Sequence, residues 1–397
     1  MTADLARLRE RLAARVPAAD PAVSAALRSV PRHLFLPEVA PEEAYRDEAI
    51  VTKRDADGMP VSSSSQPAIM AVMLDQLRLA PGHRVLEIGA GTGYNAALMR
   101  EIAGPAGQVT SVDIDPEVAS DAAEHLVAAG YPDVTVVAAD GAAGFAGHAP
   151  YDRLIATVGV SDLAPAWLSQ VTAEAVIVVP LDVHGVQLSV AFERAAGHWA
   201  SRSIAPCGFM RMRGAQAGAP TALTLAPRLR LLLPGPCPVD PAAVAAALAA
   251  PPVAAEPTGV TGGPRVFWGL NLWLAVHEPR ACGLAEERAH DLEPLLTGMP
   301  LNSHAFHATY GIVSSAGGIA VLLTGEPRAE LVATGYGPDG AALAAGLAAH
   351  VRAWAAAGHP GTTGLHVDAY PRSGADRPPS AHLLVERPYT QFVVYHE

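Results

Sequence analysis

Residues 85–97 read VLEIGAGTGYNAA, and the fold follows from this segment more than from any other. It has the pattern of a buried strand, a glycine-rich turn and the start of a helix. Gly89, Gly91 and Gly93 lie in the turn, where residues without a Cβ let the backbone approach a ligand closely. The GxGxG spacing, preceded by the acidic Glu87, differs from the GxGxxG turn that seats a pyrophosphate, so a nicotinamide cofactor is disfavoured.

The sequence on both sides of the turn continues the alternation of strand and helix. Strands are expected at residues 83–89, 108–115, 134–140, 151–158, 175–181 and 186–194, and helices at 92–104 and 116–130. Such alternation is typical of βαβ units, in which helices cover both faces of a parallel sheet. The sequence therefore predicts a doubly wound α/β domain.

Acidic residues close the next two strands of this predicted sheet. Asp113 follows Gly93 by 113 − 93 = 20 residues, the position where a carboxylate can accept both hydroxyls of a ribose. Asp140 and Gly141 end a third strand, from which they can reach an adenine ring. Glycines can also serve a turn for its geometry alone, but the three strand ends together favour S-adenosylmethionine, which has a ribose and an adenine without a diphosphate. Its methionyl amino and carboxylate groups suit Glu87 and the amides of the turn.

Composition narrows the class of protein. A chain of 397 residues corresponds to two or three domains at about 150 residues each. Half of its residues are hydrophobic and 17% are charged, which excludes a disordered chain. The net charge, 27 − 39 = −12, argues against nucleic acid or an anionic membrane as a partner.

Cysteine usage and apolar patterning predict a cytoplasmic location. The three cysteines, Cys207, Cys237 and Cys282, form no CxxC pair, so neither a disulfide framework nor a thiolate zinc site is expected. Residues 5–12 alternate leucine with charge, which predicts an amphipathic helix instead of a signal peptide. Every apolar stretch is interrupted before the roughly 18 residues that a membrane span needs.

The chain divides into two predicted domains. We assign residues 1–214 to the first, with an N-terminal helical segment at 1–80 and the cofactor core at 81–214. Residues 215–263 contain Gly/Pro clusters and an alanine run, and predict a linker with one helix. Residues 264–397 predict an α+β domain. Its strands are expected at 265–276, 318–323, 329–337, 364–371 and 391–397, with a helix at 341–358.

Several ordered motifs of the first half resemble the protein L-isoaspartyl O-methyltransferases. They are VPRHLFLP at 30–37, SSSQP at 63–67, VLEIGAGTGY at 85–94, SVDIDPE at 111–117, APYDRLI at 149–155 and GFMRMRG at 208–214. The resemblance implies a Rossmann-like class I methyltransferase that moves a methyl group from S-adenosylmethionine to a peptide carboxylate. Such a carboxylate has an ordinary pKa of about 4, so it is ionised at neutral pH and needs no general base.

The same resemblance implies roles for individual residues. Ser65 takes the place of the family's active-site serine, where it would bind the cofactor or orient the acceptor without acting as a nucleophile. Ser63 and Ser64 would lie at the cofactor, in positions where the family usually has Thr and Ile, which makes the acceptor pocket more polar. Ala90 and Ile114 would contact the cofactor beside the turn and the ribose.

The SSSSQP motif and the long extension resemble a narrower group that works in the biosynthesis of ribosomally made, modified peptides, including lanthipeptides. That likeness implies methylation of an aspartate in a modified precursor peptide, after which the ester gives aspartimide and isoaspartate. The extension would then recognise the peptide. The alternatives are a general repair enzyme for isoaspartyl proteins, or a catalytically silent peptide-binding scaffold.

Other chemistry has weaker support. The sequence has no GxSxG elbow, which disfavours a serine hydrolase. His304 and His307 could face one metal ion, but no third ligand follows at a suitable spacing, so we expect no metal site. Taken alone, the serine run 62–65 would predict a flexible polar loop. No pattern in the sequence favours a particular oligomeric state.

Overall fold

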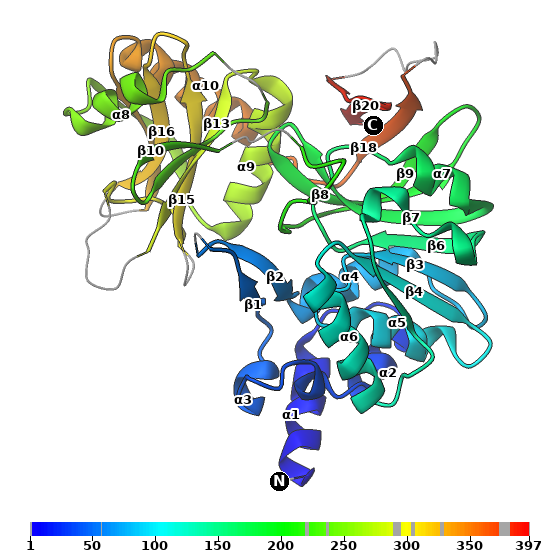
Figure 1. Ribbon diagram of the computed structural model, residues 1–397. Helices are drawn as coiled ribbons and strands as arrows, with labels where there is room; N and C mark the ends of the chain where they lie inside the picture. The colour runs from blue at the N-terminus through cyan, green and yellow to red at the C-terminus, as the bar shows by residue number, and fades with distance from the viewer. Residues whose placement is uncertain are drawn as a thin grey trace.

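The computed structural model describes residues 2–56, 58–218, 222–235, 238–288, 295–302, 306–325, 329–372 and 382–396. Figure 1 shows two lobes, each built around a β-sheet, with helix α9 (Pro264–His277) between them. Cys207 and Cys282 are buried, whereas Cys237 and His304 lie outside the described residues. Within the described residues, no helix combines the length and the hydropathy needed to cross a bilayer.

An N-terminal helical segment and a two-stranded hairpin precede the first large sheet. They comprise α1 (Thr2–Arg15), α2 (Pro21–Ser29), the 3-10 helix η1 (Arg32–Phe35), α3 (Pro41–Ala44), β1 (Ile50–Arg54) and β2 (Pro60–Ser64). The predicted amphipathic helix is α1, whose Leu12 is buried. Leu12 and Leu27 pack in one core cluster with Leu74 and Leu98, so this segment covers one face of the first sheet.

The first lobe contains a ten-stranded sheet in the order β19-β20-β18-β9-β8-β7-β6-β3-β4-β5. Its strands are β3 (Arg84–Ile88), β4 (Gln108–Asp113), β5 (Thr135–Ala138), β6 (Tyr151–Ala156), β7 (Val171–Val183), β8 (Val186–Arg194), β9 (Trp199–Pro206), β18 (Leu365–Pro371), β19 (Leu383–Glu386) and β20 (Thr390–His396). Strands β3 to β7 pair in parallel, and the pairs from β7–β8 through β19–β20 are antiparallel.

The parallel part is buried on both faces. Its helices are α4 (Pro67–Leu77), α5 (Tyr94–Ala103), α6 (Pro116–Ala128) and α7 (Pro165–Gln170), with the short 3-10 helices η2 (Gly141–Ala143) and η3 (Ala146–His148). Val85 and Leu86 are neighbours on β3, yet Val85 joins the cluster of α4 and α5 whereas Leu86 joins that of Trp167 on α7. Successive strand residues point to opposite faces, so both faces carry a core. The predicted α/β class, a Rossmann-like doubly wound fold with a further C-terminal sheet, is confirmed.

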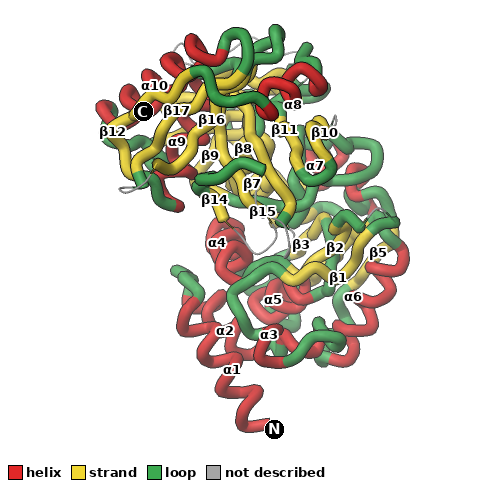
Figure 2. Tube along the Cα trace, turned by 90° about the vertical axis from the view of Figure 1, so that its left-hand side faces the viewer, coloured by secondary structure: helices red, strands yellow, loops and turns green. Residues whose placement is uncertain are grey.

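The second lobe contains an eight-stranded antiparallel sheet in the order β10-β11-β13-β15-β16-β17-β12, with β14 beside β15. Its strands are β10 (Ala222–Ala226), β11 (Leu229–Leu232), β12 (Ala254–Thr261), β13 (Ala281–Glu287), β14 (Leu301–Asn302), β15 (Phe306–Val313), β16 (Ile319–Gly325) and β17 (Glu330–Tyr336). Helices α8 (Pro241–Ala249), α9 and α10 (Gly340–Ala356) pack around it, as Figure 2 shows from the side.

Residues 265–276, predicted as a strand, form helix α9, so that prediction was wrong. Phe267, Leu270 and Leu274 face the core of the second sheet, while Leu272 faces that of the first. A helix buried between two sheets is apolar on more than one side, and its sequence then looks like the continuous apolar run of a buried strand.

The pairing of the strands also differs from the predicted domain boundaries. The segment 215–263, predicted as a linker with one helix, supplies β10, β11, α8 and β12 to the second lobe. Strands β18, β19 and β20, predicted to belong to the C-terminal domain, return to the first sheet, where Ala369 of β18 pairs with Trp199 of β9. The second sheet is therefore inserted between two strands of the first.

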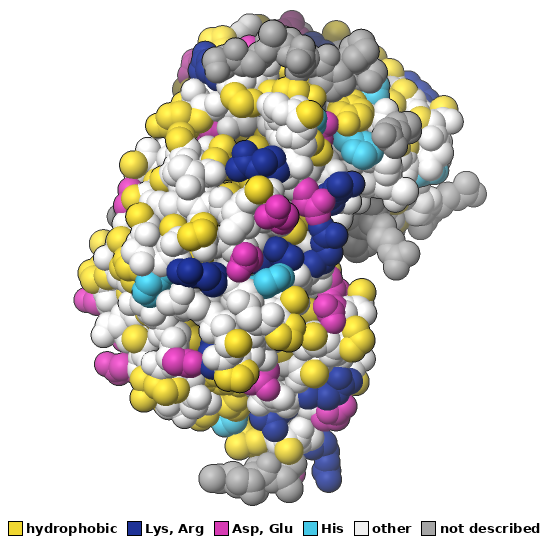
Figure 3. All heavy atoms as spheres, turned by 90° about the vertical axis from the view of Figure 1, so that its right-hand side faces the viewer, with side chains coloured by type: hydrophobic (Ala, Val, Ile, Leu, Met, Phe, Trp, Pro, Cys, Tyr) yellow, Lys and Arg dark blue, Asp and Glu magenta, His cyan; other side chains and the backbone are white. Residues whose placement is uncertain are grey.

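One face of the molecule carries positive and negative side chains side by side. On the face drawn in Figure 3, lysine and arginine side chains lie beside aspartate and glutamate side chains across the middle of the molecule. Neighbouring charges of opposite sign partly cancel each other's field at a distance.

Candidate active site

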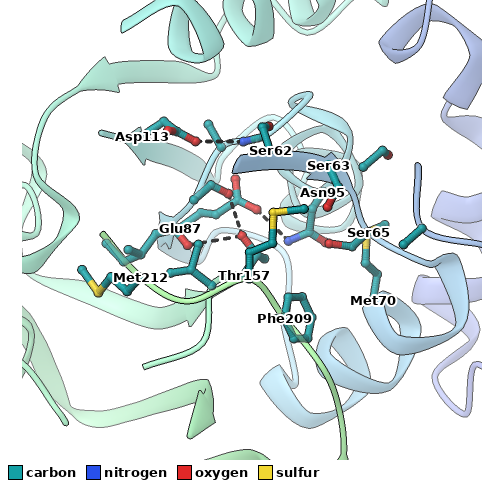
Figure 4. A pocket seen from close by; sticks show the side chains of 18 of the residues that line it. Ser62, Ser63, Ser65, Met70, Glu87, Asn95, Asp113, Thr157, Phe209 and Met212 are labelled. Carbon is teal, nitrogen blue, oxygen red and sulfur yellow. Dashed lines mark hydrogen bonds between the residues drawn. The ribbon is translucent and has the colours of Figure 1, made fainter. Parts of the chain in front are cut away.

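A cavity of about 560 Å³ lies where β3 and β4 end. Its walls come mainly from the end of β2, the glycine turn after β3, the end of β4 and the loop after β9, which are distant in sequence, with further residues from α4, from the segment after β6 and from Gly141. Figure 4 shows Asp113 at one side of the cavity and Ser65, Met70 and Phe209 at another. Trp268 of α9 also contributes to the lining, so the second lobe borders the site.

The glycine turn is held tightly on both sides. Gly89 has φ +99°, and a Cβ there would lie 2.7 Å from Thr157 Oγ1. Gly91 has φ +54°, and its Cβ would lie 3.1 Å from the Ser63 carbonyl oxygen. Gly93 also has a positive φ, +86°. These positions require glycine both for their backbone conformation and for the protein atoms around them. Gly89 and Gly91 line the cavity and Gly93 does not, and the close approach of a ligand to the turn stays a prediction.

Asp113 closes β4 beside the glycine turn. Its Oδ2 accepts a hydrogen bond from the Gly91 backbone N–H at 3.1 Å, and its Oδ1 accepts one from Asp115 N–H at 3.0 Å. The carboxylate lines the cavity and is 9% exposed. Carboxylate oxygens have two lone pairs each, so both remain able to accept a further hydrogen bond from a ligand hydroxyl.

Glu87 lies fully buried beneath the turn. It accepts hydrogen bonds from Asn95 Nδ2 at 2.7 Å and from Ser111 Oγ at 2.6 Å. Burial raises the pKa of Glu87 to about 7, although the hydrogen bonds from Ser111 and Asn95 act in the opposite direction. Both neighbours therefore orient a carboxyl group that can change its charge near neutral pH.

Asn95 was not predicted as a site residue, although it lies within the quoted stretch. It is buried in the first turn of α5 and lines the cavity. Its Oδ1 atom has no hydrogen-bond partner in the part of the chain that the structure describes. A buried acceptor is costly when unpaired, so this atom is suited to receive a donor from a ligand. The signal in the sequence was a polar residue at the buried N-terminus of a helix.

The serine run forms strand β2 and its anchored end, not the flexible loop that its composition alone would predict. Ser62 and Ser64 are buried, while Ser63 and Ser65 are partly exposed, and all four line the cavity. The guanidinium of Arg32, itself fully buried, donates a hydrogen bond to the Ser65 carbonyl oxygen at 3.1 Å. Ser65 is thus fixed by its backbone, which leaves its hydroxyl to the cavity.

Lys53 ties the hairpin to the other side of the cavity. Its Nζ lies 2.8 Å from Asp115 Oδ2 and 2.7 Å from Glu117 Oε2, both at the N-terminus of α6. The hydrogen bond from Lys53 lowers the pKa of Asp115. Neither Lys53 nor Arg32 could be assigned from spacing, because their partners lie far away in the sequence.

Asp140 does not line the cavity, but Gly141 beside it does. The Asp140 carboxylate accepts hydrogen bonds from Ala142 N–H at 2.9 Å and from Ala215 N–H at 2.7 Å. Asp140 therefore secures the end of the GFMRMRG segment against the strand end. Its predicted contact with adenine stays a prediction.

The remaining predicted positions, Ala90 and Ile114, line the cavity. So does Cys207, which sequence reasoning left out of the site; burial raises its pKa to about 12, so its thiol stays protonated. Among the described residues, no three histidine, cysteine or acidic side chains come together as metal ligands do.

A parallel sheet whose first strand ends in this glycine turn, with a carboxylate closing the next strand, defines a Rossmann-like class I methyltransferase, whose cofactor is S-adenosyl-L-methionine. The cradle fits that molecule. Asp113 offers acceptors for a ribose, and Asn95 Oδ1 offers an unpaired acceptor for an ammonium group.

Comparison with known proteins identifies the family. The family model of protein-L-isoaspartate(D-aspartate) O-methyltransferase matches residues 6–216, and the chain belongs to that family. The protein-L-isoaspartate O-methyltransferase of Methanococcoides burtonii is 36% identical over 195 residues, covering 49% of this chain and 93% of its own. That of Methanopyrus kandleri is 36% identical over 214 residues, covering 52% and 92%.

The likeness in fold extends beyond the matched half. A solved protein-L-isoaspartate O-methyltransferase covers 93% of this chain and 96% of its own, at 20% identity and a TM-score of 0.50. The fold of the whole chain, extension included, therefore has a counterpart in a solved structure that is named protein-L-isoaspartate O-methyltransferase. The role predicted for the extension stays a prediction.

Proposed function

We propose that the protein transfers a methyl group from S-adenosylmethionine to an aspartyl-derived carboxylate within a peptide, at the cavity described above. The observation that carries this proposal is that the cofactor cradle and Ser65 share one cavity with Arg211 and Arg213. Each guanidinium lies beside an aspartate: Arg211 is 3.2 Å from Asp182 Oδ2, and Arg213 is 4.0 Å from Asp115 Oδ2. A guanidinium has five N–H donors, so both arginines can still donate hydrogen bonds to an anionic acceptor.

The residues divide into cofactor holders and acceptor holders. Asp113 would hold the ribose hydroxyls, and the glycine turn with Asn95 would hold the methionyl end. Ser65, held in place through Arg32, would orient the acceptor carboxylate. When bound, the cofactor supplies an electrophilic methyl group on a sulfonium, whose C–S electron pair stays on sulfur as the carboxylate oxygen forms its new bond to carbon.

No proton has to move in this reaction, because the acceptor carboxylate is already ionised at neutral pH. The protein's task is to hold the two partners in line and to keep water out, which can supply several kcal/mol of the barrier. Met70 and Phe209 line the cavity on the same side as Ser65, where their apolar side chains would exclude water from the acceptor.

The finer proposal concerns the peptide. The polar SSSSQP strand and the extension support an aspartate in a ribosomally made, modified precursor as the acceptor. The backbone amide that follows would then displace methanol from the ester, giving aspartimide and later isoaspartate. General repair of isoaspartyl proteins is the second candidate, and the likeness of the whole chain to a solved protein-L-isoaspartate O-methyltransferase favours it.

One experiment separates the two. The purified protein is incubated with S-adenosylmethionine and either an unstructured isoaspartyl peptide or a cyclised, aspartate-containing precursor peptide. Mass spectrometry follows the gain of one methyl group and the later loss of methanol. Preference for the cyclised peptide supports the precursor role, and preference for the isoaspartyl peptide supports repair. If S-adenosylhomocysteine forms with neither peptide, the proposed acceptor class is wrong.

Ser65→Ala tests the acceptor side. We expect turnover to fall by about tenfold or more while the dissociation constant of S-adenosylmethionine stays within about twofold, since a single positioning hydrogen bond is lost. Ser169→Ala serves as control, because Ser169 lies on α7 and bonds to the Ala166 carbonyl oxygen at the surface. Unchanged turnover in Ser65→Ala would remove this hydroxyl from the reaction.

A further inference from the structure

A second cavity, of about 390 Å³, adjoins the active site, and its lining includes none of the residues assigned to the cofactor. It lies between the first sheet and the helices of the second lobe. Val186 and Leu188 of β8 form one wall, and Leu272 of α9 and Trp354 of α10 form another. All four of these side chains are at most 3% exposed. The volume falls in the range of roughly 300–1,000 Å³ typical of sites for small ligands or side chains.

The two cavities share part of their lining. Pro206, at the end of β9, and Trp268, on α9, belong to the lining of both. Pro206 pairs with Leu188 across the antiparallel β8–β9 ladder, and Leu188 lines the second cavity, so the linings of the two cavities meet on these two strands. A chain that places a carboxylate in the first cavity would pass Trp268 on its way to the second.

Trp268 has the properties of a peptide contact. It is 41% exposed, whereas Phe267 beside it on the same helix is fully buried. Tryptophan is enriched among the residues that carry most of the binding energy of interfaces, because it buries much apolar area at small entropic cost. A large, half-exposed ring at the junction of two cavities therefore indicates a surface that a ligand covers.

The far wall is rigid. The Trp354 indole N–H donates a hydrogen bond to the Pro360 carbonyl oxygen at 2.9 Å, and the ring of His359 packs edge-on against it at 4.5 Å. Gly269 lets α9 lie close to this ring, since a Cβ there would be 3.0 Å from Trp354 Cζ2. When the walls of an apolar cavity are already ordered, a ligand binds without the loss of free energy that ordering them would cost.

We infer that this second cavity is a specificity subsite, which takes a bulky apolar side chain of the acceptor peptide a few residues from the methylated carboxylate. The inference rests on the proposed function and names the substrate more closely: a peptide with an acidic residue near Phe, Leu or Trp. An extended peptide rises about 3.3 Å per residue and turns alternate side chains to the same face, so it can present both groups to one surface.

The prediction is tested with a peptide scan. A parent isoaspartyl peptide carries alanine at the four positions on each side of the acceptor, and each position is changed in turn to phenylalanine. Binding is measured by fluorescence anisotropy of labelled peptide with S-adenosylhomocysteine present, and kcat/KM by release of S-adenosylhomocysteine from S-adenosylmethionine. We expect one position where phenylalanine improves both quantities by roughly tenfold or more, as burial of such a ring in an apolar site allows.

Two variants connect that preference to the cavity. In Gly361→Phe the new ring would occupy the cavity, since Gly361 lines it and a Cβ there meets no atom within 4 Å. In Trp268→Ala the shared wall is lost. Both should reduce the phenylalanine preference to less than threefold, and Trp268→Phe should restore part of it. Tyr389→Ala, which removes an aromatic ring that is 50% exposed and lines neither cavity, should keep the full preference.

Each outcome decides something. Equal binding and turnover of all peptides, or a preference that survives both Gly361→Phe and Trp268→Ala, overturns the subsite while the methyltransferase proposal stands. A binding preference that both variants abolish, without methylation of any peptide, supports the subsite and refutes the proposed reaction. Thermal unfolding and the affinity for S-adenosylhomocysteine show whether each variant is folded; if Gly361→Phe is not, Trp268→Ala alone decides.

Discussion

Replacing Asp113 by asparagine removes one charge from the cofactor cradle with almost no change in shape. Both carboxylate oxygens accept backbone N–H groups, from Gly91 at 3.1 Å and from Asp115 at 3.0 Å. An amide has only one oxygen, so its NH₂ group must face one of these donors, and that side can no longer accept from a ribose hydroxyl. A hydrogen bond to a charged group contributes about 1.5–3 kcal/mol. We therefore expect a loss of about 2 kcal/mol in cofactor affinity, or roughly thirtyfold in Kd.

Isothermal titration of S-adenosylmethionine and S-adenosylhomocysteine into the Asp113→Asn protein measures this loss. Asp121→Asn is the matched control, because Asp121 lies exposed on α6. Thermal unfolding of both variants separates a direct effect on the ligand from collapse of the turn. A Kd within twofold of the unmodified protein would refute the assignment of Asp113 to the ribose, and with it the placement of the cofactor along β4.

Three further predictions test the turn, the buried carboxyl and the topology. The pKa of Glu87 is raised from its ordinary 4.5 to about 7, so the stability that its protonated form contributes is fully present below pH 4.5 and is lost as pH rises through 7. The free energy of unfolding, measured by chemical denaturation, should therefore fall over this range by on the order of 3 kcal/mol in the unmodified protein but not in Glu87→Gln. The same pH dependence of the free energy of unfolding in both proteins would contradict this prediction. Gly89→Ala should cost about 1–3 kcal/mol in the free energy of unfolding, given its φ of +99° and the nearby Thr157 hydroxyl, and unchanged stability would mean that the turn relaxes. A chain truncated after residue 363 keeps the second sheet but loses β18–β20 and should not unfold cooperatively, whereas a wild-type unfolding temperature would show that the first sheet does not need these strands.

The parts of the site that could be predicted are those with short-range signals. Gly89, Gly91 and Asp113 each follow directly from a strand end, and parallel strands bring their carboxyl ends to one edge of the sheet. The period of two in β8 and the apolar runs of β3 and β4 were likewise readable, because their partners are neighbours in the same βαβ pattern.

The parts that could not be predicted depend on partners far away in the sequence. Arg32 reaches Ser65 across 33 positions, and Lys53 reaches Asp115 across 62. In the same way, nothing local marks β18 as a neighbour of β9, because an antiparallel edge can accept any strand of matching pattern. The charge and polarity of a single residue indicate that it requires a hydrogen-bond or ion-pair partner, but only the fold shows which residue is that partner.

Insertion of the second lobe into the first sheet bears on how selectivity arises. Chain segments enter the lobe after β9 and leave it before β18, and these two strands are paired, so the lobe is held at both ends. Helix α9 buries Leu272 in the core of the first sheet and Phe267 in that of the second. Trp268 is therefore carried on an element that two cores fix, not on a mobile arm. A ring placed in this way selects peptides by what fits between it and the sheet, and such selection does not require the lobes to move.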